Sequence, residues 1–360
     1  MNVRYQSDSD STTPREETSL LWRARDNRKG RNSIAVPRLQ DEDGEDGTFM
    51  PLRYTPRMSS KITDIARNLS RMATTFAYWD MSFWSGASYT IGSALFVATG
   101  VLAWGPVAYG EHFETASADH YGGPYTFFVG ALFYQVGAVA AYLEAVNDGS
   151  FHGAAMRRLL DGNEQDSKKL LDEKVKHFFS HNARPRRPQH RSVWYTTWRW
   201  WPTWRALRSH HAYEIGYLAC AIQLFGVTLY GVTAVVIIPG ILTSLNHWQT
   251  LAAFWIPQVI AALCFLIASV MFTLETQEKW WKMEPGVLGW WIGVWSTAGS
   301  VGFELIACFG IKAWAAGDQA HWAEYQSDLA TVWGSTCYLI GSFLQWYEAL
   351  NKNPIEELFK

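Results

Sequence analysis

The sequence predicts an all-α, polytopic membrane protein with six transmembrane helices, arranged as three repeated helical hairpins, with both termini in the cytosol. Three observations predict this fold class: six long apolar segments, an internal repeat that keeps its register, and an uneven distribution of basic residues. A helix that spans a bilayer needs roughly 20 mainly apolar residues. The segments that meet this length are residues 84–106, 124–147, 213–238, 253–275, 287–310 and 329–349.

Composition favours a membrane over a soluble helical core. The chain has 360 residues and 20 Trp, and many of these Trp lie near the ends of the apolar segments, where an indole ring suits the headgroup region. Most of the charge lies in residues 1–80 and 148–210, which lowers the mean hydropathy of the whole chain. Six separate apolar runs of this length are difficult to bury in a soluble protein.

The internal repeat is clearest in the second helix of each predicted hairpin. Four residues of the first hairpin recur in the third at identical spacing, and the second hairpin has two small residues and a Glu in the same frame. The three sets are Gly130, Gly137, Glu144 and Asn147; Gly334, Gly341, Glu348 and Asn351; and Ala261, Ala268 and Glu275. The first helices share a Gly-x-x-x-aromatic step, at Gly92 and Phe96, Gly226 and Tyr230, and Gly299 and Phe303. A repeat in fixed register predicts one structural unit used three times.

The basic residues set the predicted orientation. Of 31 Lys and Arg, 13 precede the first span and 13 lie between the second and third spans, whereas the loops after spans one, three and five hold only Lys312. The positive-inside rule then places the even-numbered connections and both termini in the cytosol. The predicted units are a disordered cytosolic tail (residues 1–75), hairpin repeat 1 (76–147), a basic cytosolic loop (148–210), hairpin repeat 2 (211–276), hairpin repeat 3 (277–351) and a short C-terminal tail (352–360).

The N-terminal tail contains a candidate sorting signal. Glu16 stands four positions before the Leu20-Leu21 pair, which resembles the acidic dileucine signals that adaptor complexes read when they sort membrane proteins to the vacuole or lysosome. A chance match is the alternative, because such short strings are common. Later in the tail, residues 60–75 carry an apolar face at helical spacing, which predicts a short interfacial helix leading into the first span.

The loop 148–210 ends in a segment where Trp and Arg alternate. Its members are Trp198, Arg199, Trp200, Trp201, Trp204 and Arg205. Such a pattern can stack on nucleic-acid bases. Because the third span begins within about ten residues, we favour anchoring at the membrane interface beside anionic lipid, and no nucleic-acid partner.

The repeated glutamates are the first candidates for chemistry. Residues seven apart lie nearly on one helix face, so Glu144, Glu275 and Glu348 each end a stripe of Gly or Ala at the cytosolic side. A ring of three carboxylates around a pseudo-threefold axis could bind a cation or relay protons. The alternative, which we favour, is that each Glu bonds a neighbouring helix end or reaches into the interface.

Glu304 is the second candidate, because it lies within the fifth predicted span with no adjacent charge. An ionisable group at membrane depth is expensive and is commonly functional. Gln135, Gln223 and Gln258 are its expected polar neighbours across helices. A simple interhelical hydrogen bond is an equally good interpretation.

The sequence contains no motif that indicates an enzyme, a metal centre or a cofactor. The four cysteines, Cys220, Cys264, Cys308 and Cys337, all fall inside predicted spans, and no His accompanies them there. No zinc-spaced Cys/His set, phosphate-binding loop or nucleophile elbow occurs. We therefore expect no enzymatic activity, no metal site and no cofactor.

Several short segments carry a resemblance to a known group. They are Trp201–Trp204, His211–Cys220, Thr273–Gln277, Pro285–Trp290 and Ile340–Glu348. Together they resemble a group of uncharacterised fungal multi-pass integral membrane proteins, and the hairpin segment Ile91–Phe96 is similar to the small YrhK-type membrane domain. The resemblance covers roughly residues 80–350 and implies membrane residence and a repeated two-helix unit. It implies no activity, so no functional residue is carried over.

Two functions remain open from the sequence. The first is transport of an ion or small solute through the three-repeat core, using Glu304, Gln135, Gln223 and the repeated glutamates. The second is a non-catalytic membrane scaffold, linked to a sorting adaptor, that acts through its tail and loop. We expect an endomembrane location, with the vacuolar membrane first and the plasma membrane as the alternative.

Overall fold

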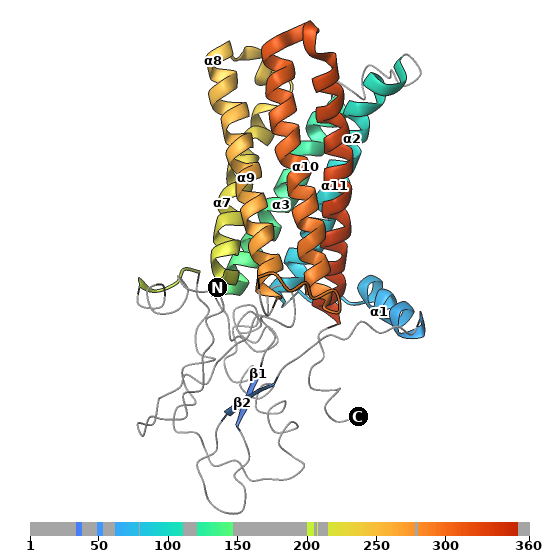
Figure 1. The fold of residues 1–360 in the computed structure, drawn as a ribbon, viewed down its shortest axis with the longest axis vertical. Coiled ribbons are helices and arrows are strands. Elements are labelled where there is room, and N and C mark those ends of the chain that lie inside the picture. Colours follow the sequence, from blue (N-terminus) through green and yellow to red (C-terminus); the bar gives the residue numbers. More distant parts are fainter. Residues whose placement is uncertain are drawn as a thin grey trace, which may run out of the picture.

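A computed structural model of the chain describes residues 34–37, 49–52, 62–78, 80–110, 121–146, 200–204, 207, 215–277 and 280–351. The described chain is predominantly helical (Figure 1). Its α-helices are α1 (Ile62–Thr74), α2 (Met81–Tyr109), α3 (Gly123–Val146), α7 (Ile215–Val236), α8 (His247–Thr250), α9 (Ile256–Glu275), α10 (Leu288–Ala316) and α11 (His321–Leu350). Short 3₁₀ turns are η5 (Leu242–Ser244) and η7 (Gly317–Ala320), and the π-helical segment η6 (Leu251–Trp255) joins α8 to α9.

The six long helices form a closed ring. Each packs against the next long helix in chain order, from α2 through α3, α7, α9 and α10 to α11, and α11 packs against α2. Successive helices run in opposite directions along the long axis of the molecule (Figure 1). The ring therefore consists of three antiparallel hairpins, α2–α3, α7–α9 and α10–α11.

Five of these helices are long and apolar enough to cross a bilayer, judged by length and composition. They are α2, α3, α7, the continuous helix His247–Glu275 and α10. The prediction of multiple membrane-length helices is thus confirmed for five of six segments. Helix α11 has ample length, at 30 residues, but its polar residues, such as Glu324, Asp328 and Gln345, lower its apolar character.

The two helices of each hairpin approach closely through a small residue at the same place; we call these contacts the hairpin seams. In α2–α3, a Cβ atom on Gly92 would lie 2.9 Å from the backbone oxygen of Gly130. In α10–α11, a Cβ atom on Gly299 would lie 2.9 Å from that of Gly334. In α7–α9, the corresponding distance from Gly226 to the oxygen of Ala261 is 3.2 Å. In lipid, small residues permit the close van der Waals packing that drives helix association.

The contacts between hairpins also use small residues. A Cβ on Gly86 of α2 would lie 2.7 Å from Trp346 Cα of α11, and one on Gly100 would lie 2.8 Å from the backbone nitrogen of Val332. Next to the first of these contacts, the buried Gln345 Nε2 donates a hydrogen bond of 2.9 Å to Ser85 Oγ. These contacts join the last helix of the ring to the first.

Several element boundaries differ from the prediction. Helix α10 extends to Ala316, so Lys312 lies inside the helix and not in a loop. Helix α2 contains Pro106 and continues to Tyr109. A proline this close to the end of a helix disturbs it little, because only a short stretch of helix follows. The four cysteines lie in α7, α9, α10 and α11, and none is in a disulfide.

The predicted disordered tail contains described secondary structure. Strands β1 (Ile34–Pro37) and β2 (Phe49–Leu52) pair antiparallel, with Ile34 opposite Leu52. Both segments are apolar, unlike the acidic run between them, so backbone pairing is locally favoured there. Further on, α1 occupies most of the segment predicted to form an interfacial helix.

Replacing Gly299 with Ala tests the hairpin seam of α10–α11. The added methyl would lie 2.6 Å from a ring carbon of Tyr338 and 2.9 Å from the Gly334 oxygen, so the helices must separate. We expect a loss of about 1–3 kcal/mol of stability, measured as a lower thermal midpoint in detergent. Gly231→Ala is the matched control, because nothing lies within 4 Å of its Cβ position, and it should leave the midpoint unchanged or raise it. Equal midpoints for the two variants would contradict the tight seam.

Candidate functional site

Three aromatic side chains meet at the centre of the helix ring; we call them the aromatic layer. Phe96, Tyr230 and Phe303 come from the first helix of each hairpin, and each is at most 3% exposed. Their ring centroids are 6.0 Å apart for Phe96 and Tyr230, 5.9 Å for Phe96 and Phe303, and 5.5 Å for Tyr230 and Phe303. These distances are those of directly packed aromatic rings, so the layer fills the middle of the ring.

Each ring of the aromatic layer rests on an aromatic ring from the second helix of its own hairpin. The centroid distances are 4.9 Å from Phe96 to Tyr134, 5.6 Å from Tyr230 to Phe265 and 5.2 Å from Phe303 to Tyr338. The two supporting tyrosines are themselves fixed by hydroxyl pairs. Their hydroxyls lie 2.7 Å from Ser93 Oγ for Tyr134 and 2.5 Å from Ser300 Oγ for Tyr338.

The positions one heptad before the aromatic layer on the same helices carry polar side chains, and we call these three residues the polar layer. Tyr89, Gln223 and Ser296 stand seven residues before the three aromatic residues and are all buried. Seven residues correspond to a rise of about 10 Å along a helix. The side-chain oxygen of Gln223 has no hydrogen-bond partner among the described residues, and neither has that of the buried Gln258 in α9. Buried amide oxygens of this kind are costly unless a partner or water reaches them.

The repeated glutamates lie at one end of the bundle, and two of them contact the first helix of their own hairpin. Ser82 Oγ, in the first turn of α2, donates a hydrogen bond to Glu144 Oε1. A side chain at Gly216, in the first described turn of α7, would collide with the Glu275 carboxylate. Glu275 and Glu348 are buried, and Glu144 is half-buried. A carboxylate beside a helix N-terminus is stabilised by the backbone N–H groups and the helix dipole.

This placement favours the structural interpretation of the glutamates. Within the part of the chain that the structure describes, no group of three or more His, Cys, Asp or Glu side chains could hold a metal ion. The three carboxylates therefore do not converge on a common cation. The contact of Glu144 with Ser82 is the bond to a neighbouring helix end that the sequence suggested as the alternative.

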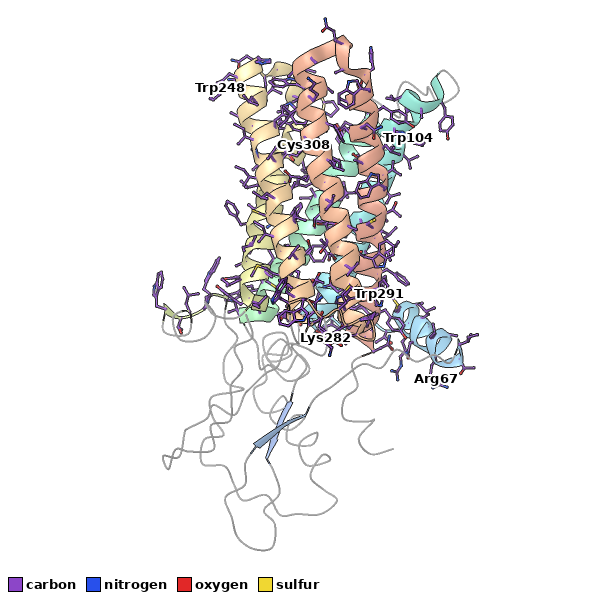
Figure 2. The ribbon with its side chains drawn as sticks, in the orientation of Figure 1. Arg67, Trp104, Trp248, Lys282, Trp291 and Cys308 are labelled. Atoms are coloured by element: carbon purple, nitrogen blue, oxygen red, sulfur yellow. The ribbon has the colours of Figure 1, made fainter. Side chains whose placement is uncertain are left out.

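Glu304 lies beside the centre rather than in it. It follows Phe303 in α10, is half-buried, and shares a helix face with the exposed Val301 and Cys308. Figure 2 labels Cys308 on this part of the bundle. Glu304 Oε2 is buried and has no hydrogen-bond partner among the described residues.

The expected polar neighbours of Glu304 do not bond to it. Gln135 Nε2 instead donates a hydrogen bond of 3.3 Å to Thr228 Oγ1, between α3 and α7 on the exposed side. Gln223 belongs to the polar layer, and the Gln258 side-chain oxygen has no hydrogen-bond partner in the described part of the chain. Within the described residues, none of the three expected glutamine neighbours forms a hydrogen bond with Glu304. Residues at similar depth in the ring can face different neighbours, because each helix has its own rotation.

The other predicted sites are only partly described. Trp200, Trp201 and Trp204 are exposed, and the ring of Trp201 lies 6.1 Å from that of Tyr142 at the end of α3. Trp198, Arg199, Arg205 and the candidate sorting residues Glu16, Leu20 and Leu21 lie outside the described residues.

The supporting residues Tyr134, Phe265 and Tyr338 were missed by the sequence reasoning. A signal was present: each stands four residues after Gly130, Ala261 or Gly334, which repeats the small-x-x-x-aromatic step of the first helices.

Comparison of the chain with protein-family models, with characterised proteins and with solved structures gives no match. The resemblance to fungal multi-pass membrane proteins therefore stays a prediction.

Substitutions at Glu144 test its contact with the first turn of α2. Glu144→Gln keeps an oxygen that accepts from Ser82 and should cost less than about 1 kcal/mol, whereas Glu144→Leu should cost about 1–3 kcal/mol. A double-mutant cycle of Glu144→Leu with Ser82→Ala, followed by unfolding in mixed detergent micelles, measures the coupling. Additive effects of the two substitutions would exclude the contact as a source of stability.

Proposed function

We propose that all six long helices cross the membrane as three repeats of one hairpin, with both termini in the cytosol. The equivalent positions of the three hairpin seams support the repeat. The contacts of α11 with α2 at Gly86 and Gly100 support a sixth span, because these glycines are 14 residues, or about 21 Å, apart along the helix. A helix packed along α2 over that length shares its depth in the bilayer. The charge distribution supports the orientation.

We propose further that the chain moves an ion or small solute along the central axis of the ring, and that it is not an enzyme. The observation that carries the proposal is the set of buried polar residues Tyr89, Gln223 and Ser296, one heptad before the aromatic layer on the first helix of each hairpin. Buried amide and hydroxyl groups inside a membrane bundle are expensive and typically line a path for a polar species. Phe96, Tyr230 and Phe303 then form a hydrophobic constriction, which is a known way to gate a pore.

A second candidate function is a non-catalytic scaffold. Its support is the packing of the axis itself, since the three aromatic rings are buried against one another. A bundle that stays closed would serve as a membrane anchor for the cytosolic tail, residues 1–75, and the basic loop, residues 148–210. A sorting adaptor at the tail and anionic lipid at the loop are the partners that this candidate uses.

Flux measurements in liposomes test the axial route. A panel of tracer ions, protons and amino acids is offered to reconstituted protein, and Gln223→Leu is compared with Glu304→Gln. We expect Gln223→Leu to reduce flux about tenfold, corresponding to about 1.4 kcal/mol, because it removes a polar group from the polar layer. Glu304→Gln should change flux less than about twofold, because Glu304 lies beside the axis.

Three outcomes would count against transport along the axis. Equal flux in wild type and Gln223→Leu would remove the polar layer from the route. No flux for any member of the panel, from protein with an intact thermal transition, would favour the scaffold. A larger loss in Glu304→Gln than in Gln223→Leu would move the route to the outer face of α10.

We propose the vacuolar membrane as the location, with Glu16, Leu20 and Leu21 as the sorting signal. Replacing both leucines by Ala should move a tagged protein from the vacuolar membrane to another membrane, since the adaptor contacts the apolar pair. Fluorescence microscopy of the tagged full-length chain measures this. Replacement of the nearby Thr12 and Thr13 by Ala is the matched control, and an unchanged location in the leucine variant would refute the signal.

A further inference from the structure

Helix α1 has two distinct sides. At 3.6 residues per turn, its apolar residues fall within an arc of about 120°. They are Ile62, Ile65, Ala66, Leu69, Met72 and Ala73. Arg67 and Arg71 lie on the opposite side. Asn68 lies at the border between the two sides, next to Met72.

The bundle covers only the border of α1. Asn68 Nδ2 donates a hydrogen bond of 2.8 Å to the hydroxyl of Tyr347 in α11, and Met72 is 7% exposed. The apolar side turns elsewhere, because Ile62 is 83% exposed, Ile65 39% and Leu69 40%. The helix is thus fixed to α11 by one edge, while Ile62, Ile65, Ala66 and Leu69 on its apolar side remain exposed.

The position of α1 matches the headgroup layer of a bilayer. Tyr347 lies in the last turn of α11, and α2 begins at Met81, shortly after α1 ends. The exposed Trp280 and Trp281 precede α10 at this same end of the bundle. Such indole rings mark the membrane interface. In Figure 1, α1 extends sideways from the end of the bundle, and Figure 2 shows Arg67 on its outer part.

We propose that α1 lies in the headgroup layer of a phospholipid leaflet, with Ile62, Ile65, Ala66 and Leu69 among the upper acyl chains. Arg67 and Arg71 then face the phosphates and water, where their charge is complementary. The apolar side continues the lipid-facing surface of the bundle through the exposed Phe76. The bond between Asn68 and Tyr347 sets the rotation of α1, so that the apolar side faces the acyl chains. This inference is independent of transport.

Depth-dependent quenching in nanodiscs tests the proposal on the full chain. The four native cysteines are replaced by Ala, and a single cysteine carrying an environment-sensitive fluorophore is placed at Ala66 or at Thr63. Both positions are exposed, so neither label should lower the thermal midpoint. Nitroxide groups on the upper acyl chain should quench the label at Ala66 about threefold more than the label at Thr63, because only the first lies on the apolar side.

Three results would overturn the proposal. Equal acyl-chain quenching at the two positions would mean that α1 is not oriented by the membrane. Water-like emission at both would mean that α1 lies off the bilayer. Blue-shifted emission at Ala66 without acyl-chain quenching would mean that protein, such as a second copy of the chain, covers the apolar side.

As a second variant, Asn68→Ala with Tyr347→Phe should reduce the difference in acyl-chain quenching between labels at Ala66 and Thr63 if the hydrogen bond sets the rotation.

Discussion

The close approach of helix backbones is the interaction on which the rest of the structure depends. Lipid tails are as apolar as leucine, so burial alone gives two helices little reason to associate in a membrane. Van der Waals packing must supply the attraction, and it requires a surface without side chains. Gly92 over Gly130 and Gly299 over Gly334 provide such surfaces in two hairpins, and Gly226 provides one in the third. With the hairpins closed and Gly86 against Trp346, six helices complete a ring.

A ring of six helices has a centre that must be filled, and here aromatic side chains fill it. The rings of Phe96, Tyr230 and Phe303 contact one another, and each rests on an aromatic ring from its own hairpin. Buried polar groups such as Gln223 follow one heptad away. The glutamates lie where a carboxylate costs less free energy to place, at the end of the bundle. There a carboxylate meets a helix N-terminus, as Glu144 does at Ser82. The buried polar side chains one heptad from the aromatic layer are therefore neutral amides and hydroxyls.

Much of the architecture was predictable because it depends on local composition and spacing. The apolar segments, their approximate ends and the small-x-x-x-aromatic step all follow from the order of residues along the chain. The surroundings of Glu304 were not predictable. Depth along a helix can be counted from the sequence, but the neighbours of a side chain depend on helix rotation. A rotation of one residue, about 100°, separates the buried Phe303 from the half-buried Glu304. Polar residues at matching depth, such as Gln135, consequently bond elsewhere.

The sequence by itself determined that this chain forms long apolar helices in hairpins, because length, composition and the position of glycines act within a few turns of one helix. It also determined that α1 has an apolar and a cationic side. Only the tertiary structure decided that α11 packs against α2 and closes the ring, that three aromatic residues meet at its centre, and that α1 is held by its edge at Asn68. These features depend on the relative rotation and order of helices, which are fixed by contacts between residues as far apart in the sequence as Asn68 and Tyr347.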